Sequence, residues 1–194
     1  MLSQTYWNER YLKHDTGWDL GEISRPLKEY FDQLTNRKLR ILIPGCGNAY
    51  EAEYLFKLGF EHVYLIDLSQ EALNAFQTRN PEFPKDQLIC GNFFQHHEKY
   101  DLMVEQTFFC AIDPKLRADY VKHASTLLNP GGKLIGLLFD DPLNTEHPPF
   151  GGSKTEYEEL FEPYFELNTL EKAYNSIGPR QNRELFIKLI NKAC

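Results

Sequence analysis

The sequence predicts a doubly wound α/β fold, in which helices cover a mostly parallel sheet. Three observations indicate it. Short apolar runs alternate with segments of helical periodicity along the 194 residues, as in proteins built from strand–helix–strand units. A glycine-rich turn follows the first apolar run, and an acidic residue ends the second. The last two runs form a closing pair of strands, which we expect to be antiparallel.

Two segments precede the first predicted strand. An aromatic segment, residues 6–18, and a helix over residues 24–34 come first. The first strand is predicted over residues 39–43, a short apolar run typical of a buried parallel strand. The next helix, residues 49–58, is predicted to end at Gly59, because glycine commonly follows the C-terminus of a helix.

The second strand–helix unit follows the same pattern. The strand is predicted over residues 62–66, directly before Asp67. Ser69 can cap the helix that follows, residues 69–78, and a proline soon afterwards ends it. A short third strand is predicted over residues 87–90.

The middle of the chain contains the strand with the most apolar sequence. A fourth strand is predicted over residues 100–104, and an aspartate–proline pair opens a helix over residues 113–128. After a turn at residues 129–132, the fifth strand covers residues 133–139. It is apolar on both faces, which is typical of a central strand.

The C-terminal part combines a long loop with the closing strands. The loop, residues 140–153, is rich in proline, and loops of this length in compact domains are usually functional or mobile. A short helix is predicted over residues 155–160, and the closing strands over residues 164–174 and 183–190.

The composition disfavours several classes of protein. The formal charge of −7 disfavours a duplex-binding protein, since phosphate contacts need clustered lysine and arginine. No apolar run approaches the ~20 residues of a membrane span, and the N-terminus lacks the apolar core of a signal peptide. The four cysteines form no C-x-x-C pair. We therefore expect a cytoplasmic protein that binds no metal, no membrane and no nucleic acid.

The turn after the first strand indicates a nucleotide-type site. Gly45 and Gly47 flank Cys46 and allow the backbone to approach a ligand closely. The third glycine of the NAD fingerprint would fall at Tyr50, which disfavours a pyrophosphate site. Asp67 lies 20 residues after Gly47 and can accept hydrogen bonds from both ribose hydroxyls of an adenosyl cofactor. Its alternative role is to cap the next helix.

Two further features of this region carry predictions. Asn92 and Phe93 follow the third strand, where an adenosyl site would hold the adenine between a polar side chain and an apolar surface. A plain turn with core phenylalanines is the alternative. Asn48 and Glu51 resemble a capping pair for the helix after the glycine turn.

Other stretches of the sequence are more specific signatures than the glycine turn. They are Trp7-x-x-Arg10-Tyr11, Thr16-x-Trp18-Asp19-x-Gly21, the run Thr107-Phe-Phe-Cys-Ala-Ile-Asp-Pro114 with Arg117 and Tyr120 after it, and His147-Pro-Pro-Phe150. Together they resemble the thiopurine methyltransferase family, and within it the plant-type halide and thiol methyltransferases and their bacterial relatives. The resemblance spans most of the chain.

The resemblance implies a class I methyltransferase that uses S-adenosylmethionine. It implies a seven-stranded sheet with a C-terminal antiparallel pair and an N-terminal helical lid. It also implies one domain over residues 1–194, in which residues 1–36 cover the cofactor and residues 37–194 form the α/β core.

The same resemblance assigns residues to the cofactor. Trp7, Tyr11 and Trp18 would fold over it, and aromatic faces suit a sulfonium cation. Cys46, Leu68 and Glu105 are implied to belong to this site as well. Without the resemblance, the spacing of Trp7 and Tyr11 favours an amphipathic helix whose aromatic residues are simply core.

The predicted acceptor is a small soft nucleophile, a thiol or a halide. Where the family has an acidic residue and a tyrosine before the Thr-Phe-Phe run, this chain has Glu105 and Gln106. A halide or a thiolate needs no general base, so we predict no acid–base pair. Candidates for the acceptor pocket are Asp140, Asp141, His147, Phe150 and Gln106.

Three other functions remain open from the sequence. One is a non-catalytic protein that binds S-adenosylmethionine or S-adenosylhomocysteine, suggested by the departures at Gln106 and Asn92. Another is a methyltransferase for a different small-molecule acceptor. The third is an NAD-dependent oxidoreductase, which Tyr50 disfavours. We expect a monomer or a weak dimer.

Overall fold

The computed structural model describes residues 3–192 of the chain. Its strands form a seven-stranded sheet with the order β3-β2-β1-β4-β5-β7-β6. This confirms the predicted fold class, a mostly parallel sheet that ends in an antiparallel pair. The chain forms two compact units, residues 1–96 and residues 97–194, and each is described by itself below.

The first unit is built on three parallel strands. They are β1 (Arg40–Pro44), β2 (His62–Asp67) and β3 (Leu88–Cys90). Ile41 of β1 pairs with Val63 of β2, and Ile66 pairs with Ile89 of β3. Four of the five β1 residues are buried, so this strand lies in the core of the unit.

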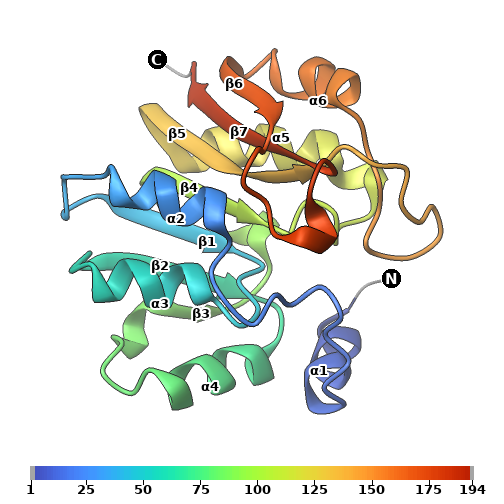
Figure 1. The fold of residues 1–194 in the computed structure, drawn as a ribbon. Coiled ribbons are helices and arrows are strands. Elements are labelled where there is room, and N and C mark those ends of the chain that lie inside the picture. Colours follow the sequence, from blue (N-terminus) through green and yellow to red (C-terminus); the bar gives the residue numbers. More distant parts are fainter. Residues whose placement is uncertain (1–2, 193–194) are drawn as a thin grey trace. The chain divides into compact units, whose positions relative to one another are not determined.

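Four helices belong to the first unit. They are α1 (Gln4–Leu12), α2 (Arg25–Asp32), α3 (Tyr50–Lys57) and α4 (Gln70–Arg79). The crossovers through α3 and α4 step the same way along the sheet, and right-handed crossovers place both helices on one face. Figure 1 shows α2 beside α3, and α1 packs against α4.

The second unit combines parallel and antiparallel strands. They are β4 (Tyr100–Gln106), β5 (Leu128–Phe139), β6 (Phe165–Lys172) and β7 (Glu184–Asn191). β4 runs parallel to β5, whereas β7 is antiparallel to both β5 and β6. The predicted closing pair of strands is therefore confirmed.

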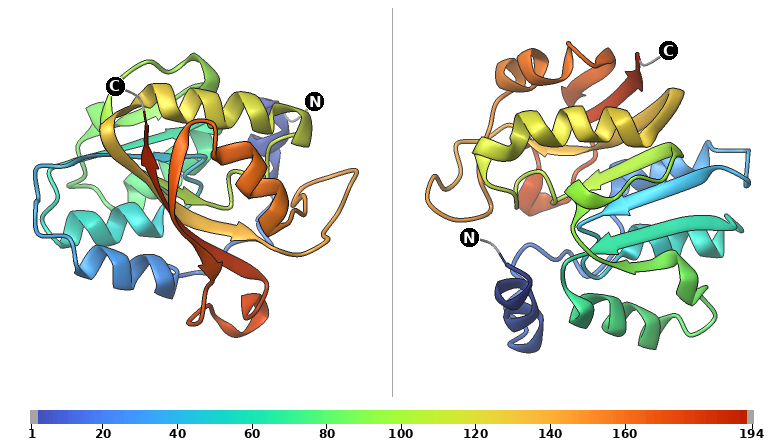
Figure 2. Two further views of the ribbon diagram at one scale, coloured as in Figure 1. Left: turned by 90° about the horizontal axis from the view of Figure 1, so that it is seen from above. Right: turned by 180° about the vertical axis from the view of Figure 1, so that it is seen from behind.

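Helices α5 (Arg117–Leu127) and α6 (Lys154–Phe161) cover one face of these strands, as Figure 2 shows. An aromatic cluster joins the two helices to the turn after β4. The Phe109 ring lies 5.1 Å from Tyr120, 5.7 Å from Tyr157 and 5.8 Å from Phe161, measured between centroids. All four side chains are buried, and this cluster holds the turn after β4 in place.

Short 3-10 helices complete the chain. They are η1 (Lys85–Gln87), η2 (Phe93–Gln95), η3 (Pro114–Leu116) and η4 (Gly178–Arg180). Among the described residues, no helix has the length and apolar character needed to cross a bilayer.

Two local predictions differ from the structure. β5 begins at Leu128 rather than at residue 133, because the stretch predicted as a turn continues the strand through an irregular register opposite Tyr100 and Leu102. The aspartate–proline pair opens η3 instead of an α-helix, and α5 follows only from Arg117 onward.

Candidate active site

The turn after β1 has an unusual backbone. Gly45, Gly47 and Ala49 have φ values of 55°, 53° and 54°, in the left-handed region that glycine adopts most easily. Gly47 also lies under Tyr11, because a Cβ atom added there would come within 2.6 Å of the Tyr11 hydroxyl oxygen. Any side chain at position 47 would therefore displace Tyr11 as well as strain the backbone.

Asp67 ties this turn to the next helix. Its Oδ2 accepts a hydrogen bond from the Gly47 N–H at 2.9 Å, and its Oδ1 accepts one from the Ser69 N–H at 2.8 Å. Burial raises the pKa of this carboxyl group, while backbone N–H groups including those of Ser69 and Gly47 counteract the rise. Each carboxylate oxygen has a second lone pair, so ribose hydroxyls can still be bound.

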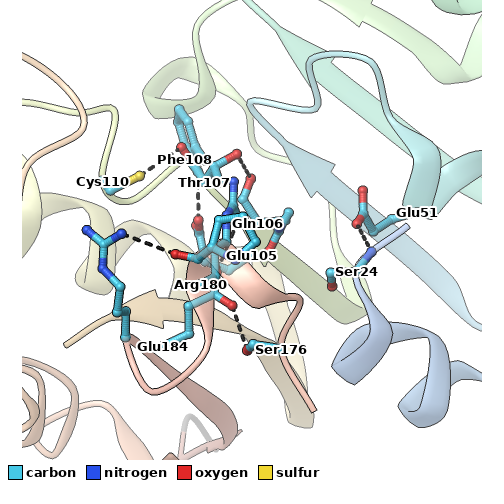
Figure 3. A network of polar contacts seen from close by, with 12 residues as sticks. Ser24, Glu51, Glu105, Gln106, Thr107, Phe108, Cys110, Ser176, Arg180 and Glu184 are labelled. Carbon is cyan, nitrogen blue, oxygen red and sulfur yellow. Dashed lines mark hydrogen bonds and ion pairs between the residues drawn. The ribbon is translucent and has the colours of Figure 1, made fainter. Parts of the chain in front are cut away.

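The predicted capping pair at the start of α3 is wrong. The N-cap is Ala49, which has no side-chain capping bond. The Asn48 amide instead donates to Asp19 Oδ2, and the Tyr50 hydroxyl lies 3.4 Å from the same oxygen. Glu51 accepts a hydrogen bond from the Ser24 N–H at 3.3 Å (Figure 3). Asp19 is thus a positioning residue that the sequence offered only as part of a motif.

The aromatic segment forms a cluster around Trp18. The Trp18 ring lies 5.7 Å from Trp7 and 6.1 Å from Tyr11, edge to face in both cases. The Arg10 guanidinium carbon lies 5.0 Å from the Trp18 centroid, and its Nε donates to the Asp15 carbonyl at 2.9 Å. These contacts fold the segment after α1 back onto the helix.

α1 has no buried residue, so its aromatic side chains are not a closed core. Trp7, Tyr11 and Trp18 are all half-buried. Asn8 anchors the helix by accepting a hydrogen bond from the Ser69 hydroxyl at 2.8 Å. A half-buried aromatic face beside the glycine turn is the arrangement expected of a segment that packs on a ligand.

Tyr11 lies among acidic neighbours. Burial raises the pKa of its hydroxyl well above the ordinary value, and Asp67 and Cys46 raise it further. The pKa of the Cys46 thiol is also raised, first by burial and then by Asp67. Both groups are therefore neutral at physiological pH, and the Tyr11 hydroxyl remains a hydrogen-bond donor beside the glycine turn.

The turn after β3 contains Asn92 and two phenylalanines. Asn92 is exposed and caps η2, because its Oδ1 accepts from the Phe94 N–H at 3.0 Å. Phe93 is buried, whereas Phe94 is half-buried. Phe94 is therefore the more exposed of the two rings, and the contact of Phe93 with the cofactor stays a prediction. Leu68 is half-buried next to Asp67.

Glu105 organises the turn after β4 in the second unit. Its Oε1 accepts from the Phe108 N–H at 2.8 Å (Figure 3) and from the Phe109 N–H at 2.8 Å. Its Oε2 accepts from the Tyr120 hydroxyl at 2.6 Å. Burial raises its pKa to about 7. With 1% of its surface exposed, Glu105 holds the turn, and its implied place in the cofactor site stays a prediction.

Gln106 follows Glu105 at the end of β4 and is half-buried. Its Oε1 is sealed from solvent and has no hydrogen-bond partner among the residues that the structure describes. The next residue, Thr107, has a φ of 60°, and its hydroxyl donates to the Gln106 carbonyl at 2.7 Å.

The loop after β5 begins with two aspartates that form ion pairs. Asp140 lies 2.6 Å from the Lys172 ammonium group, a contact that lowers the pKa of the carboxyl group. Asp141 pairs with Arg183. His147 is exposed, and Phe150 is buried, with its N–H donating to the Cys110 carbonyl at 2.7 Å.

Two buried arginines, Arg117 and Arg180, form ion pairs in the second unit. Arg117 lies 2.7 Å from Glu156 and donates to the Gly151 carbonyl at 2.8 Å, so it joins α5 to α6 and to the end of the loop. Arg180 lies 3.1 Å from Glu184 at the start of β7, and both side chains are almost fully buried. Arg117 belonged to the motif in the sequence, but its role depends on partners far along the chain.

No metal centre is present in the described part of the chain, since no group of three or more His, Cys, Asp or Glu side chains is placed to hold an ion. The thiols of Cys46, Cys90 and Cys110 are free. Cys110 is buried, which raises its pKa to about 12, so the thiol is not a nucleophile near neutral pH.

A sequence model of the family described as thiopurine S-methyltransferase (TPMT) matches residues 2–192. The chain belongs to this family. Membership of this family confirms the predicted methyltransferase activity and the predicted cofactor, S-adenosylmethionine.

Individual relatives agree with this assignment. The chain is 29% identical over 184 residues to a probable thiol methyltransferase 2 of Arabidopsis thaliana, with 92% of this chain and 81% of that protein covered. It is 29% identical over 185 residues to a thiopurine S-methyltransferase of Vibrio campbellii, with 84% of each covered.

Among solved structures, a Burkholderia thailandensis 1,6-didemethyltoxoflavin-N1-methyltransferase with bound S-adenosylhomocysteine superposes with a TM-score of 0.78. The match covers 98% of this chain and 87% of that one at 13% identity, so it shows a shared fold. The TPMT-family chain thus has a class I methyltransferase sheet.

Proposed function

We propose that this TPMT-family protein transfers a methyl group from S-adenosylmethionine to a small soft nucleophile, with a thiol as the first candidate and a halide as the second. One observation carries the proposal. The Asp67 carboxylate is fixed to the glycine turn and to the start of α4, beside a half-buried aromatic face. In this proposal the carboxylate binds the ribose hydroxyls of the cofactor, and the aromatic face binds its sulfonium cation.

The first unit supplies the residues that fit the cofactor. Gly45 and Gly47 let the backbone approach it closely, and Asp67 accepts hydrogen bonds from its ribose. Trp7, Tyr11 and Trp18 cover it and exclude water. The remaining predicted contacts in this unit are Cys46, Leu68, Asn92 and Phe93. When bound, S-adenosylmethionine supplies an electrophilic methyl group on a sulfonium sulfur.

The second unit supports an acceptor that needs no general base. Asp140 is held by Lys172, which lowers the pKa of its carboxyl group and makes it a weaker base, and Asp141 is paired with Arg183. Halides, and thiols that ionise in water, carry the negative charge themselves. The protein then contributes orientation and desolvation of the two reactants.

The proposal extends to the class of acceptor, the cellular location and the oligomeric state. We infer a small-molecule acceptor in the cytoplasm and a protein that acts as a monomer or a weak dimer. The net charge of −7 supports the inference that nucleic acid is not a substrate.

A calorimetric titration with S-adenosylhomocysteine tests the cofactor site, with NAD as the control ligand. We expect micromolar binding of the first and none of the second. Labelled S-adenosylmethionine is then incubated with a panel of thiols and with iodide, bromide and thiocyanate. Methylated product from a thiol or a halide supports the proposal. Tight binding without product from any acceptor would instead favour a non-catalytic binding protein.

A further inference from the structure

The Tyr11 hydroxyl lies directly on the glycine turn. A Cβ atom added at Gly47 would come within 2.6 Å of the hydroxyl oxygen and within 3.8 Å of the ring carbon that carries it. This contact joins α1 to the turn at a residue whose own N–H is bonded to Asp67. Tyr11 is half-buried, as are Gly45 and Cys46 of the turn, so the side chain is not sealed inside the unit.

The oxygen of this hydroxyl accepts a hydrogen bond within the same unit. Its partner is the Trp18 indole, whose N–H can only donate. The two rings lie edge to face with centroids 6.1 Å apart, and the bond lowers the pKa of Tyr11. Because the oxygen accepts this bond, the Tyr11 proton is left to donate elsewhere.

The groups around that proton are acidic but do not bind it. Asp67, Cys46 and Asp19 raise the pKa of Tyr11 through their charge and form no hydrogen bond with the hydroxyl. Asp67 Oδ2 instead accepts from the Gly47 N–H at 2.9 Å. A ligand atom that accepts the Tyr11 proton must therefore be compatible with negative neighbours.

S-adenosylmethionine carries oxygen atoms on its methionine part and on its ribose. The methionine carboxylate is negatively charged and would be repelled by the carboxylates of Asp67 and Asp19. The ribose hydroxyls are neutral, and in the proposed cofactor site they donate to Asp67. A hydroxyl group that donates one hydrogen bond can still accept another, so a ribose oxygen suits the Tyr11 proton.

We propose that Tyr11 donates a hydrogen bond to a ribose hydroxyl that Asp67 binds, and that this bond adds to the selectivity of the site for ribose over deoxyribose. The inference rests on the proposed function and deepens its cofactor site. The hydrogen bonds run in one direction, from the Trp18 indole to the Tyr11 hydroxyl, from there to the ribose hydroxyl, and on to the Asp67 carboxylate. Hydrogen bonds in such a chain polarise one another. The ribose thereby links α1 to the end of β2, and the aromatic segment closes on a ribonucleoside.

Binding of S-adenosylhomocysteine and of its 2′-deoxy and 3′-deoxy analogues tests the proposal. For each analogue we define a ribose preference, the Kd of the analogue divided by the Kd of S-adenosylhomocysteine. Calorimetry measures it in the wild type, in Tyr11→Phe, which removes only the hydroxyl, and in Tyr54→Phe. Tyr54 is the matched control, a half-buried tyrosine of α3 whose hydroxyl donates to Asp32.

A further ligand, 5′-methylthioadenosine, separates the ribose from the methionine part. It keeps the ribose and lacks the amino-acid group. We define a methionine preference as the Kd of this ligand divided by the Kd of S-adenosylhomocysteine, and measure it in the same three proteins.

We expect Tyr11→Phe to lower the ribose preference about 3- to 10-fold for one of the two deoxy analogues, the effect of losing one hydrogen bond. The methionine preference should keep its wild-type value. Tyr54→Phe should keep every wild-type ratio. The melting temperature of Tyr11→Phe without ligand should change little, because phenylalanine keeps the ring.

Three results would overturn the proposal. One is an unchanged ribose preference for both analogues in a Tyr11→Phe protein that still binds S-adenosylhomocysteine. Another is a fall in the methionine preference of that variant, which would assign the hydroxyl to the amino-acid part of the cofactor. The third is wild-type protein that binds none of these ligands, which overturns the proposed function itself.

Discussion

Asp67 has two tasks, because its carboxylate holds the glycine turn and also faces the proposed ribose site. Replacement by Asn keeps the size of the side chain but removes the charge from both hydrogen bonds. Hydrogen bonds to charged groups contribute about 1.5–3 kcal/mol each. We therefore expect Asp67→Asn to weaken S-adenosylhomocysteine binding about 10- to 100-fold by calorimetry.

The control for this change is Asp86→Asn, which alters an exposed carboxylate of the same unit. It should bind S-adenosylhomocysteine as the wild type does. Wild-type affinity in a folded Asp67→Asn protein would remove Asp67 from the cofactor site.

Glu105 should make the stability of the protein depend on pH. Its pKa of about 7 lies above the ordinary value of 4.5. Between these two pH values the folded protein keeps a proton that the unfolded chain has lost. The free energy of unfolding therefore falls as the pH rises through this window, by roughly 3 kcal/mol for a shift of this size.

The Glu105→Gln variant cannot titrate at this position, so it isolates the effect. We expect the stability of the wild type relative to this variant to fall between pH 5 and pH 8 in denaturant titrations. A constant difference across that range would show that Glu105 is ionised in the folded protein at all these pH values.

The sequence predicted some of these residues because their roles are local. Gly45 and Gly47 are required by backbone conformation, and Asp67 by its position at the end of a strand. The burial of Glu105 and its part in holding the turn could not be predicted locally. Its partner Tyr120 lies 15 residues away, and the distance between the two depends on how α5 packs.

At the scale of elements, packing into the core does not explain the aromatic side chains of α1. The helix has no buried residue, so its aromatic side chains contribute little to the core. If they cover the cofactor, Trp7→Ala should weaken binding of the cationic S-adenosylmethionine about 2- to 30-fold more than binding of neutral S-adenosylhomocysteine. The melting temperature should change little.

The matched control is Leu12→Ala on the same helix, at a side chain that is 64% exposed. It should leave both affinities unchanged. An equal loss of the two affinities in Trp7→Ala would show that the ring contributes apolar area and not recognition of the cation.

The elements themselves were more predictable than their ends. Every predicted strand has a counterpart in the structure. Buried parallel strands such as β1 leave a short apolar run, and the closing antiparallel strands leave a partly alternating pattern. The start of β5 was missed, since its first residues include a proline and two glycines that indicate a turn. The start of α3 was also misread, because the left-handed Ala49 is held by tertiary contacts and not by a capping side chain.

At the scale of the whole molecule, the two units differ in the chemistry of their side chains. The first unit holds the features that suit an adenosyl cation, and the second holds a turn and a loop whose charged groups are mostly paired. In the proposed reaction neither Asp140 nor Asp141 serves as a base, because each is held in an ion pair. This absence of a base, within the described residues, has a consequence for the pH dependence of the reaction.

With thiols, kcat/KM should rise with pH and level off near the pKa of the thiol used, because only the thiolate reacts. With iodide, kcat/KM should be nearly independent of pH. The Asp141→Asn and His147→Ala variants should keep both profiles, since Asp141 is paired with Arg183 and His147 is exposed on the loop. Initial rates at several pH values, with thiols of different acidity, measure this. A profile that no longer depends on the thiol, or a slope lost in His147→Ala, would identify a base in the protein.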